Sequence, residues 1–435
     1  MSNPRITAVK LLTKFEKNSS YSALALSDEL KKINFSDSRD KAFAVSLIYG
    51  VLEHKITLDY NISLYLVSKL SKLKIEVLNI LRVGAYQLLY MDKIPKSAAV
   101  NEAVNSSKKM GLSFSSGLIN AVLHKIANKG LILPDEENTA DYLSVLYSAD
   151  KSILSSVISD FGIEKTKEIF SVFSGRRPIY IRHNSLKCSE EQLCESLKKD
   201  GVEVTSASLD GCFCINNTGD IAELAAYKNG WFHVQDMSSQ LCCKLLDVRP
   251  GDTVVDCCAA PGGKSFTLAQ YLCGSGSILS CDMYEHKTKL IENGAKRLGI
   301  NNLKAVCSDA RELYKQGLNA DKVLCDVPCS GFGVIGRKPE IRYKTMDELS
   351  ELPIIQKEIL YSCAKMVKSG GTLIYSTCTL NKAENDAVCD SFLSDFPDFS
   401  IASQGEYSEL TDKYLTVFPE ALGGDGFFIA KFIRG

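Results

Sequence analysis

Two cysteines and an aspartate occur in short motifs that follow stretches of apolar residues. The motif VLCDVPCSGFGVIGRK (323–338) contains Asp326 and Cys329, and the motif YSTCT (375–379) contains Cys378. A thiolate can add to carbon 6 of cytosine or uracil, which makes carbon 5 able to accept a methyl group. A carboxyl group such as that of Asp326 can hydrogen-bond the protonated ring nitrogen, and a base must then remove the proton from carbon 5. These three residues are candidate catalytic groups, and their types alone leave open which thiol is the nucleophile or whether either is structural.

The elements that would position these residues alternate between strand and helix from Gly230 to the C-terminus. Buried-strand patterns cover TVVD, SILSCD, LKAVCSDA, DKVLCDVP and GGTLIYSTCT, with helix-like segments between them. This alternation predicts an open, mostly parallel sheet with helices on both faces. Ligands bind such sheets at the carboxyl ends of the strands. The fourth and fifth of these strands are expected to be neighbours, so that both thiols would open on one pocket.

An aspartate closes each of the first four predicted strands. These residues are Asp256, Asp282, Asp309 and Asp326. A single aspartate at such a position could simply cap the following helix. Four of them at one edge favour a ligand with hydroxyl groups and some positive charge, and Asp282 lies where an acidic residue typically binds ribose hydroxyls.

The loop after the first strand, CCAAPGGK (257–264), matches neither the dinucleotide motif GxGxxG nor the phosphate-binding motif GxxxxGK[ST]. Gly262 and Gly263 would let the backbone approach a ligand closely. S-adenosylmethionine (SAM), a nucleoside without phosphates, therefore fits this loop better than NAD does. The missing dinucleotide motif disfavours a dehydrogenase.

The first half of the chain divides into two further parts. Residues 1–130 read as helices without strand-like alternation, which predicts a helical bundle. Residues 131–229 start with a polar linker and helix-like sequence, and continue with a strand pattern at Arg176–Asn184, an amphipathic helix and more strand-like sequence. We expect a small α/β unit there, and three domains that cover residues 1–130, 131–229 and 230–435.

Charge is distributed unevenly, because residues 1–130 contain 19 Lys and Arg against 10 Asp and Glu, whereas the remainder contains 32 against 42. The basic part suggests a polyanionic partner, although solvated helix faces would give the same count. No apolar stretch is long enough to span a membrane, no secretory signal is evident, and the sixteen cysteines lack the spacing of a zinc site. We expect a cytoplasmic protein without a metal, in which most cysteines are small buried hydrophobic residues.

These motifs resemble those of the RNA 5-methylcytosine methyltransferases of the RsmB/Nop2/Sun family. The matching segments, GWFHVQDMSSQL, DCCAAPGGKS, CDVPCSGFGVIGRKPEI, YSTCTLNKAEN and GGDGFFIA, cover the chain from Gly230 onward. The segments LRVGAYQLLYMDKIPKSAAVNEAV and GLINAVLHKI resemble the NusB-like RNA-binding domain that precedes the catalytic part in some members. The resemblance implies an all-α NusB-like bundle, a small α/β linker domain, and a Rossmann-like class I methyltransferase domain with a mostly parallel seven-stranded sheet.

The resemblance also implies roles for individual residues. Cys378 would be the nucleophile, Cys329 would assist product release, and Asp326 would serve both catalysis and cofactor binding. SAM would contact Cys258, Ala259, Ala260, Pro261, Gly262, Gly263, Lys264, Asp282, Asp309 and Asp326. The chain departs from the family pattern at Lys287, where the family usually has an arginine, and at Asp150, near a usual Pro-Trp pair.

The implied activity is methylation of carbon 5 of a cytosine in small-subunit (16S) ribosomal RNA by a monomer, through a covalent cysteine–cytosine intermediate. Two alternatives stay open: the same chemistry on tRNA, and a non-catalytic RNA-binding factor for ribosome assembly. The NusB-like segments favour ribosomal RNA. The intact Asp326, Cys329 and Cys378 favour catalysis.

Overall fold

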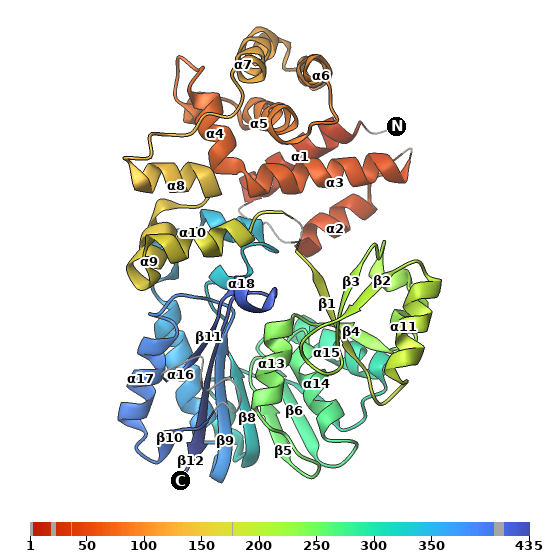
Figure 1. Cartoon of the computed structure of the whole chain (residues 1–435), viewed down its shortest axis with the longest axis vertical. Helices are drawn as coiled ribbons and strands as arrows, with labels where there is room; N and C mark the ends of the chain where they lie inside the picture. Colours follow the sequence, from red (N-terminus) through yellow and green to blue (C-terminus); the bar gives the residue numbers. More distant parts are fainter. Residues whose placement is uncertain (1–2, 19–22, 36, 176, 404–412) are drawn as a thin grey trace. The chain divides into compact units, whose positions relative to one another are not determined.

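The computed structural model describes residues 3–18, 23–35, 37–175, 177–403 and 413–435. These residues form two compact units, Met1–Ser159 with Lys338–Met346, and Asp160–Arg337 with Asp347–Gly435. Figure 1 follows the chain through the helices of the first unit and the two sheets of the second. The three-domain division at residues 130 and 229 stays a prediction, because this division into two units does not mark those positions.

The first unit is built from helices, as its sequence predicts. Leu78, Leu81 and Ala85 lie on the buried face of α5, at the helical spacing read from the sequence. Leu81 and Ala85 contribute, with residues of α1, α3, α6 and α7, to an apolar core. The helices are α1 (Pro4–Asn18), α2 (Ala23–Lys31), α3 (Ser38–Glu53), α4 (Lys55–Ser63), η1 (Leu70–Lys72), α5 (Ile75–Tyr90), α6 (Lys96–Lys109), η2 (Ser113–Ser115), α7 (Ser116–Lys129), α8 (Thr139–Tyr147) and α9 (Lys151–Phe161).

A short segment from the C-terminal half of the chain, residues 338–346, also belongs to this helical unit. It contains η6 (Pro339–Tyr343), in which Arg342 is 1% exposed and donates from Nη1 to the Tyr147 carbonyl at 2.6 Å. The Tyr343 hydroxyl donates to the Leu52 carbonyl. These contacts anchor the segment, although both of its ends lead into the second unit.

Asp150, one of the two departures from the family pattern, lies at the start of α9. Its Oδ1 accepts a hydrogen bond from the Ser152 N–H at 2.8 Å, which satisfies a backbone donor of the first turn. Its own N–H donates to the Arg342 carbonyl at 2.7 Å. The aspartate therefore caps this helix and ties it to the segment 338–346.

The second unit begins with a small antiparallel sheet in the order β2-β3-β1-β4. Strand β1 confirms the strand predicted within Arg176–Asn184, of which residue 176 lies outside the described residues. Leu193 and Leu197 of the amphipathic α11 pack against this sheet. The elements are α10 (Ile163–Val172), β1 (Ile179–His183), α11 (Glu190–Lys199), β2 (Glu203–Ser206), β3 (Cys212–Asn216), η3 (Ile221–Glu223), α12 (Ala225–Lys228) and β4 (Phe232–Val234).

The large sheet of the second unit has the order β10-β12-β9-β8-β5-β6-β7, and β11 pairs with β12 beside this path. Strands β5 to β9 pair in parallel, and β10, β11 and β12 pair antiparallel. The predicted mostly parallel sheet is confirmed, with seven strands in the path and β11 as an eighth that the sequence did not predict. Its elements are α13 (Met237–Leu245), β5 (Thr253–Asp256), α14 (Gly263–Tyr271), β6 (Ser277–Asp282), α15 (Glu285–Leu298), β7 (Leu303–Cys307), η4 (Leu313–Gln316), β8 (Ala320–Asp326), η5 (Phe332–Val334), η7 (Asp347–Leu349), α16 (Leu352–Ala364), β9 (Val367–Thr377), α17 (Asp386–Asp395), β10 (Phe399–Ile401), β11 (Leu415–Val417), α18 (Pro419–Leu422) and β12 (Phe427–Arg434).

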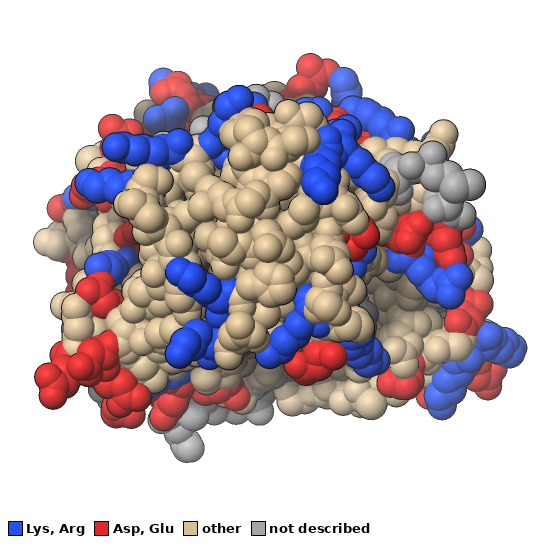
Figure 2. Space-filling model, turned by 90° about the horizontal axis from the view of Figure 1, so that it is seen from above, with Lys and Arg blue, Asp and Glu red and all other residues tan. Residues whose placement is uncertain are grey.

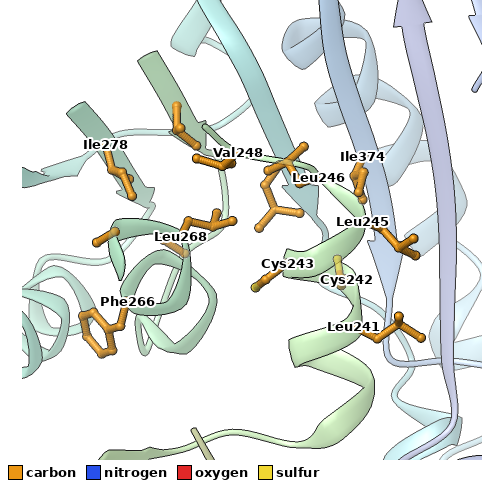
Figure 3. Close-up of a cluster of buried hydrophobic side chains, with 14 of the residues drawn as sticks. Leu241, Cys242, Cys243, Leu245, Leu246, Val248, Phe266, Leu268, Ile278 and Ile374 are labelled. Atoms are coloured by element: carbon orange, nitrogen blue, oxygen red, sulfur yellow. The ribbon is translucent and has the colours of Figure 1, made fainter. Parts of the chain in front are cut away.

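Two apolar cores cover the two faces of this sheet, because successive strand residues point to opposite faces. Val254 and Ile374 join one core with α13, α14 and α15, whereas Val255 and Tyr375 join the other with α16 and α17. Figure 3 shows the first core, where residues of α13 and α14 pack beside the strands. Continuous apolar runs in the strands are the sequence signal of burial on both faces.

Cysteines contribute to both cores. All sixteen are free thiols and eight of them are buried, so half of the cysteines, rather than most as predicted, are small hydrophobic core residues, and none belongs to a disulfide framework. Cys242 and Cys243 are examples beside Leu241 and Leu246 (Figure 3). Within the described ranges, no helix has the length and apolar character needed to cross a membrane.

Candidate active site

The loop between β5 and α14 turns tightly beside the neighbouring strand. The Ala259 N–H donates to the Cys281 carbonyl of β6, and the Gly262 N–H donates to the Ala259 carbonyl, both at 2.7 Å. Gly262 has a φ of 110°, and a Cβ atom there would lie 2.4 Å from Cζ of Phe266. This turn therefore requires glycine, for conformational and for steric reasons.

A cavity of about 180 Å³ opens beside this loop. It is lined by seven of the predicted cofactor residues, namely Cys258, Ala259, Ala260, Pro261, Gly263, Lys264 and Asp326. Val234, Gln235, Asp236, Ser239 and Asp256 complete the lining. Gly262, Asp282 and Asp309 do not line it, although Gly262 shapes the loop that does.

Asp256 closes β5 at the wall of this cavity and is 1% exposed. Its Oδ2 accepts a hydrogen bond from the Ser265 hydroxyl at 2.6 Å, whereas its Oδ1 is buried without a hydrogen-bond partner among the described residues. Burial raises the pKa of Asp256 to about 7, against the opposing effect of the Ser265 hydrogen bond. A buried carboxylate oxygen without a donor is the feature expected where a cationic or N–H-bearing ligand binds.

Lys264 and Asp326 form an ion pair in the same cavity, with Nζ and Oδ2 2.7 Å apart. Burial lowers the pKa of Lys264, but the charge of Asp326 outweighs that effect and raises it overall. The other oxygen of Asp326 accepts from the Ser376 hydroxyl of β9 at 2.8 Å. The aspartate is thus fixed between the cofactor loop and the strand that leads to Cys378.

The other two predicted rim aspartates lie outside the cavity lining. Asp282 closes β6, is 8% exposed, and accepts from the Tyr284 N–H at 3.1 Å. Nζ of Lys287 lies 3.8 Å from its Oδ1, so this departure from the family pattern keeps a positive charge near the site. Asp309 follows β7 and is held by Arg311, whose Nη2 lies 2.7 Å from its Oδ2.

The two candidate catalytic thiols lie together. Sγ of Cys329 and Sγ of Cys378 are 3.2 Å apart, because β8 and β9 pair in parallel and align Asp326 with Ser376. The Cys378 carbonyl also accepts from the Gly333 N–H at 2.9 Å. A hydrogen bond to Cys378, burial and nearby carboxylates raise the pKa of Cys329 well above its usual value. The two sulfur atoms are therefore close enough to act on one base, and which of them is the nucleophile stays a prediction of the family resemblance.

Sequence reasoning missed a charged network beside the cavity. Nε of Arg337 lies 2.8 Å from the carboxylate of Asp425, and its Nη2 lies 2.9 Å from Oδ2 of Asp236, which lines the cavity. Burial and the neighbouring Asp236 raise the pKa of Asp425 to about 6. These residues lie in the segments GWFHVQDMSSQL, GRK and GGDG. The segments match one family, but nothing in their spacing predicts that the three side chains meet.

Comparisons with known proteins agree with this architecture. Residues 243–433 match the model of the 16S rRNA methyltransferases RsmB/F, and residues 2–128 match the NusB family. The chain is similar to the probable ribosomal RNA small subunit methyltransferase B of Bacillus subtilis, with 36% identity over 98% of both chains, and to that of Synechocystis sp., with 32% identity over 99% of both. Its fold is also similar to the crystal structure of PH0851, with a TM-score of 0.84, 27% identity, and coverage of 100% of this chain and 99% of that one.

The fold therefore defines a methyltransferase preceded by a NusB-like helical domain, as the sequence predicted. The chain belongs to the RsmB/F family of 16S rRNA methyltransferases.

Proposed function

We propose that this chain methylates carbon 5 of a cytosine in 16S ribosomal RNA with SAM, through a covalent bond between Cys378 and the base. The observation that carries this proposal is the pair of thiols 3.2 Å apart at the ends of adjacent strands. Asp326 ends β8 three residues before Cys329 and lines the cavity proposed for the cofactor. The curated relatives named for ribosomal RNA support the substrate.

Several features of the cavity fit SAM. The Gly262 turn, where a Cβ atom would meet the Phe266 ring, sets the path of the loop that lines the cavity, and Oδ1 of Asp256 is a buried acceptor without a donor among the described residues. Asp326 and Asp256 place negative charge in the lining, which suits a sulfonium and an amino group. Residues 258–264, Asp282, Asp309 and Asp326 would hold the cofactor, which supplies a methyl group when bound.

In this mechanism, the Cys378 thiolate forms a bond to carbon 6 of a cytosine that is unpaired or flipped out of a helix. The ring nitrogen takes a proton from solvent as this bond forms, and Asp326 accepts a hydrogen bond from it; the proton returns to solvent when Cys378 leaves. Once Cys378 is bonded to carbon, it no longer shares a hydrogen bond with Cys329. Cys329 then gives its own proton to solvent and, as a thiolate, accepts the proton from carbon 5. The sulfur–carbon bond then breaks, the ring double bond re-forms, and Cys378 leaves as a thiolate.

Cofactor affinity should depend on pH through Asp256. A cationic ligand favours ionised Asp256, whose pKa in the structure is raised to about 7. We expect SAM affinity to increase as pH rises from 6 to 8. The increase should be at most about tenfold per pH unit while the pH lies below that pKa, and should level off above it. Calorimetric titration at both pH values checks this. The isosteric control, Asp256→Asn, should flatten the dependence, and an equal pH dependence in both proteins would contradict the role of Asp256.

The helical unit offers a basic surface for the RNA. Figure 2 shows Lys and Arg side chains around a central area of uncharged residues on the face seen from above, with Asp and Glu mainly toward its margins. Lys108 and Lys109 end α6 and are exposed, and Lys129 ends α7. We propose that such lysines neutralise RNA phosphates.

Replacing Lys108 and Lys109 by alanine should weaken RNA binding and reduce its salt dependence. Each lost phosphate contact lowers the slope of log affinity against log salt by about 0.9 for a duplex and about 0.7 for a single strand. Filter binding at several salt concentrations measures this slope. Lys31→Ala with Lys32→Ala is a matched control, because these lysines of the same unit are paired with Asp28 and Glu29. If the wild type, the Lys108 and Lys109 variant and the control variant all have the same slope, Lys108 and Lys109 make no phosphate contacts.

Substitutions test this surface better than deletion of residues 1–130 does. Residues 338–346 pack within the same unit, so deletion would remove the Leu52 carbonyl and the Lys55 N–H that hydrogen-bond the Tyr343 hydroxyl. A loss of activity in the truncated chain would then reflect misfolding as well as lost RNA contacts.

Bisulfite mapping of ribosomal RNA from a strain that lacks the gene tests the proposed reaction as a whole. One cytosine of 16S RNA should lose its 5-methyl group. A change in tRNA alone would favour the tRNA alternative, and unchanged methylation in every RNA would favour a non-catalytic assembly factor. We place the reaction in the cytoplasm, where thiols stay reduced, and in a single copy of the chain.

A further inference from the structure

Glu384 is a fully buried carboxylate that contacts the motif containing Cys329. Its side chain is 0% exposed. Its Oε2 accepts hydrogen bonds from the N–H of Ser330 at 2.9 Å and from Nε2 of Gln356 at 2.8 Å, and its Oε1 accepts from Nδ2 of Asn381 at 2.9 Å. Ser330 directly follows Cys329. One oxygen of Glu384 therefore holds the backbone next to this thiol.

The same buried network reaches the residues around Cys378. The hydroxyls of Ser330 and Thr379 are 2.7 Å apart, and Nδ2 of Asn385 donates to the Thr379 carbonyl at 2.9 Å. The backbone carbonyl of Glu384 accepts from the hydroxyl of Tyr375, a residue of β9, at 2.6 Å. The residues that follow Cys329 and those that follow Cys378 are thus joined through one set of hydrogen bonds.

We infer that Glu384 is a positioning residue that holds the Cys329 loop against the Cys378 loop, so that both thiols meet one base. For its catalytic consequence this inference rests on the function proposed above. A buried carboxylate with three N–H donors is a strong and rigid acceptor. Without it, the buried Ser330 N–H would lack its partner and the Gln356 amide would keep only the Pro328 carbonyl, so the loop would move to satisfy the Ser330 N–H.

Glu384→Gln is the conservative test, because the side chain keeps its size while its NH2 group must face one of the three donors. A small displacement of a reacting group can cost up to about a hundredfold in rate, so we expect kcat for methyl transfer to fall by about ten- to a hundredfold. SAM affinity, measured by calorimetry without RNA, should not change. Glu358→Gln on α16 is the matched control, since it alters an exposed ion pair with Arg311, 3.4 Å apart, and should leave kcat unchanged.

Gln356 provides a test of the network. Gln356→Ala removes the amide that donates both to Glu384 and, at 3.0 Å, to the Pro328 carbonyl. It should lower kcat by itself, and the double variant with Glu384→Gln should fall by less than the product of the two effects. If the loss of kcat in the double variant equals the product of the two single losses, the two residues act independently and do not belong to one shared network. If Glu384→Gln lowers SAM affinity and thermal stability as well as kcat, the residue only supports the fold.

A measurement without RNA separates this inference from the proposed reaction. Diamide, an azo oxidant, takes two hydrogens from Cys329 and Cys378 as their disulfide forms and is itself reduced to a hydrazine. Mass spectrometry of the linked peptides gives the rate for this pair alone. We expect the disulfide to form at least about tenfold more slowly in Glu384→Gln than in the wild type or Glu358→Gln, because the thiols are less often in contact. If the wild type methylates no RNA, the proposed function fails but this rate still decides the role of Glu384, and equal rates in all three proteins overturn the inference.

Discussion

With RNA and SAM, Cys378→Ala should transfer no methyl group and form no covalent complex, whereas Cys329→Ala should accumulate RNA attached through Cys378. The first variant lacks the nucleophile. The second can still attack and methylate the base, but it lacks the group that helps to remove the proton from carbon 5. The 3.2 Å distance between the two sulfur atoms lets both act on one base, and the resemblance of the PCSG and STCT motifs to the RNA methyltransferase family supplies the division of roles.

A denaturing gel of each variant with substrate RNA measures the covalent complex, and labelled SAM measures methyl transfer. Cys325→Ala is a useful control, since this buried thiol of β8 belongs to the core and should leave both readouts near the wild type. A shifted band for Cys378→Ala alone would mean that the thiols have exchanged roles. Methylation without any band in either variant would exclude the covalent mechanism.

Asp282→Ala should weaken SAM binding by on the order of a hundredfold or more, since two charge-assisted hydrogen bonds to ribose hydroxyls contribute about 1.5–3 kcal/mol each. Asp282 closes β6 and is 8% exposed, so its carboxylate is held at the sheet edge where ribose is expected. Calorimetry gives the affinity, and a thermal melt shows whether the fold survives. The hydrogen bond from the Tyr284 N–H can persist in Asp282→Asn, which separates loss of charge from loss of the turn.

Lys287→Met is the control for this site. It removes the ammonium that lies 3.8 Å from Asp282 while leaving the carboxylate in place, and it should change SAM affinity by much less than Asp282→Ala does. If Asp282→Ala binds SAM as tightly as the wild type, Asp282 is not part of the cofactor site.

The sheet and much of the site could be predicted because their signals are local in the sequence. Apolar runs marked the strands, and each strand end could be read from the residue that follows the run. Parallel pairing then requires Asp326 and Cys378 to lie at the same edge, which the register of β8 and β9 confirms. Their spacing could not show which of the two thiols is the nucleophile, because both occupy equivalent positions after neighbouring strands.

The remaining features depend on contacts between distant residues, for which spacing gives no signal. Arg337 and Asp425 are separated by 88 positions, and Ser330 and Glu384 by 54. Strand β11 has three residues, too few for an alternating pattern to identify it. Asp309 was predicted from its position after β7; the structure pairs it with Arg311, two residues away, outside the cavity lining, and its contact with the cofactor stays a prediction.

The use of thiols as core residues has a consequence for how the purified protein can be handled. Eight of its sixteen cysteines are buried and chemically protected only while the chain is folded. Unfolding exposes them to air, and any disulfide formed then would join sulfurs that must separate again before the cores can close. Unfolding is therefore reversible only with a reductant present. Without a reductant, heat inactivation is irreversible, and its half-life measures an unfolding rate rather than an equilibrium stability.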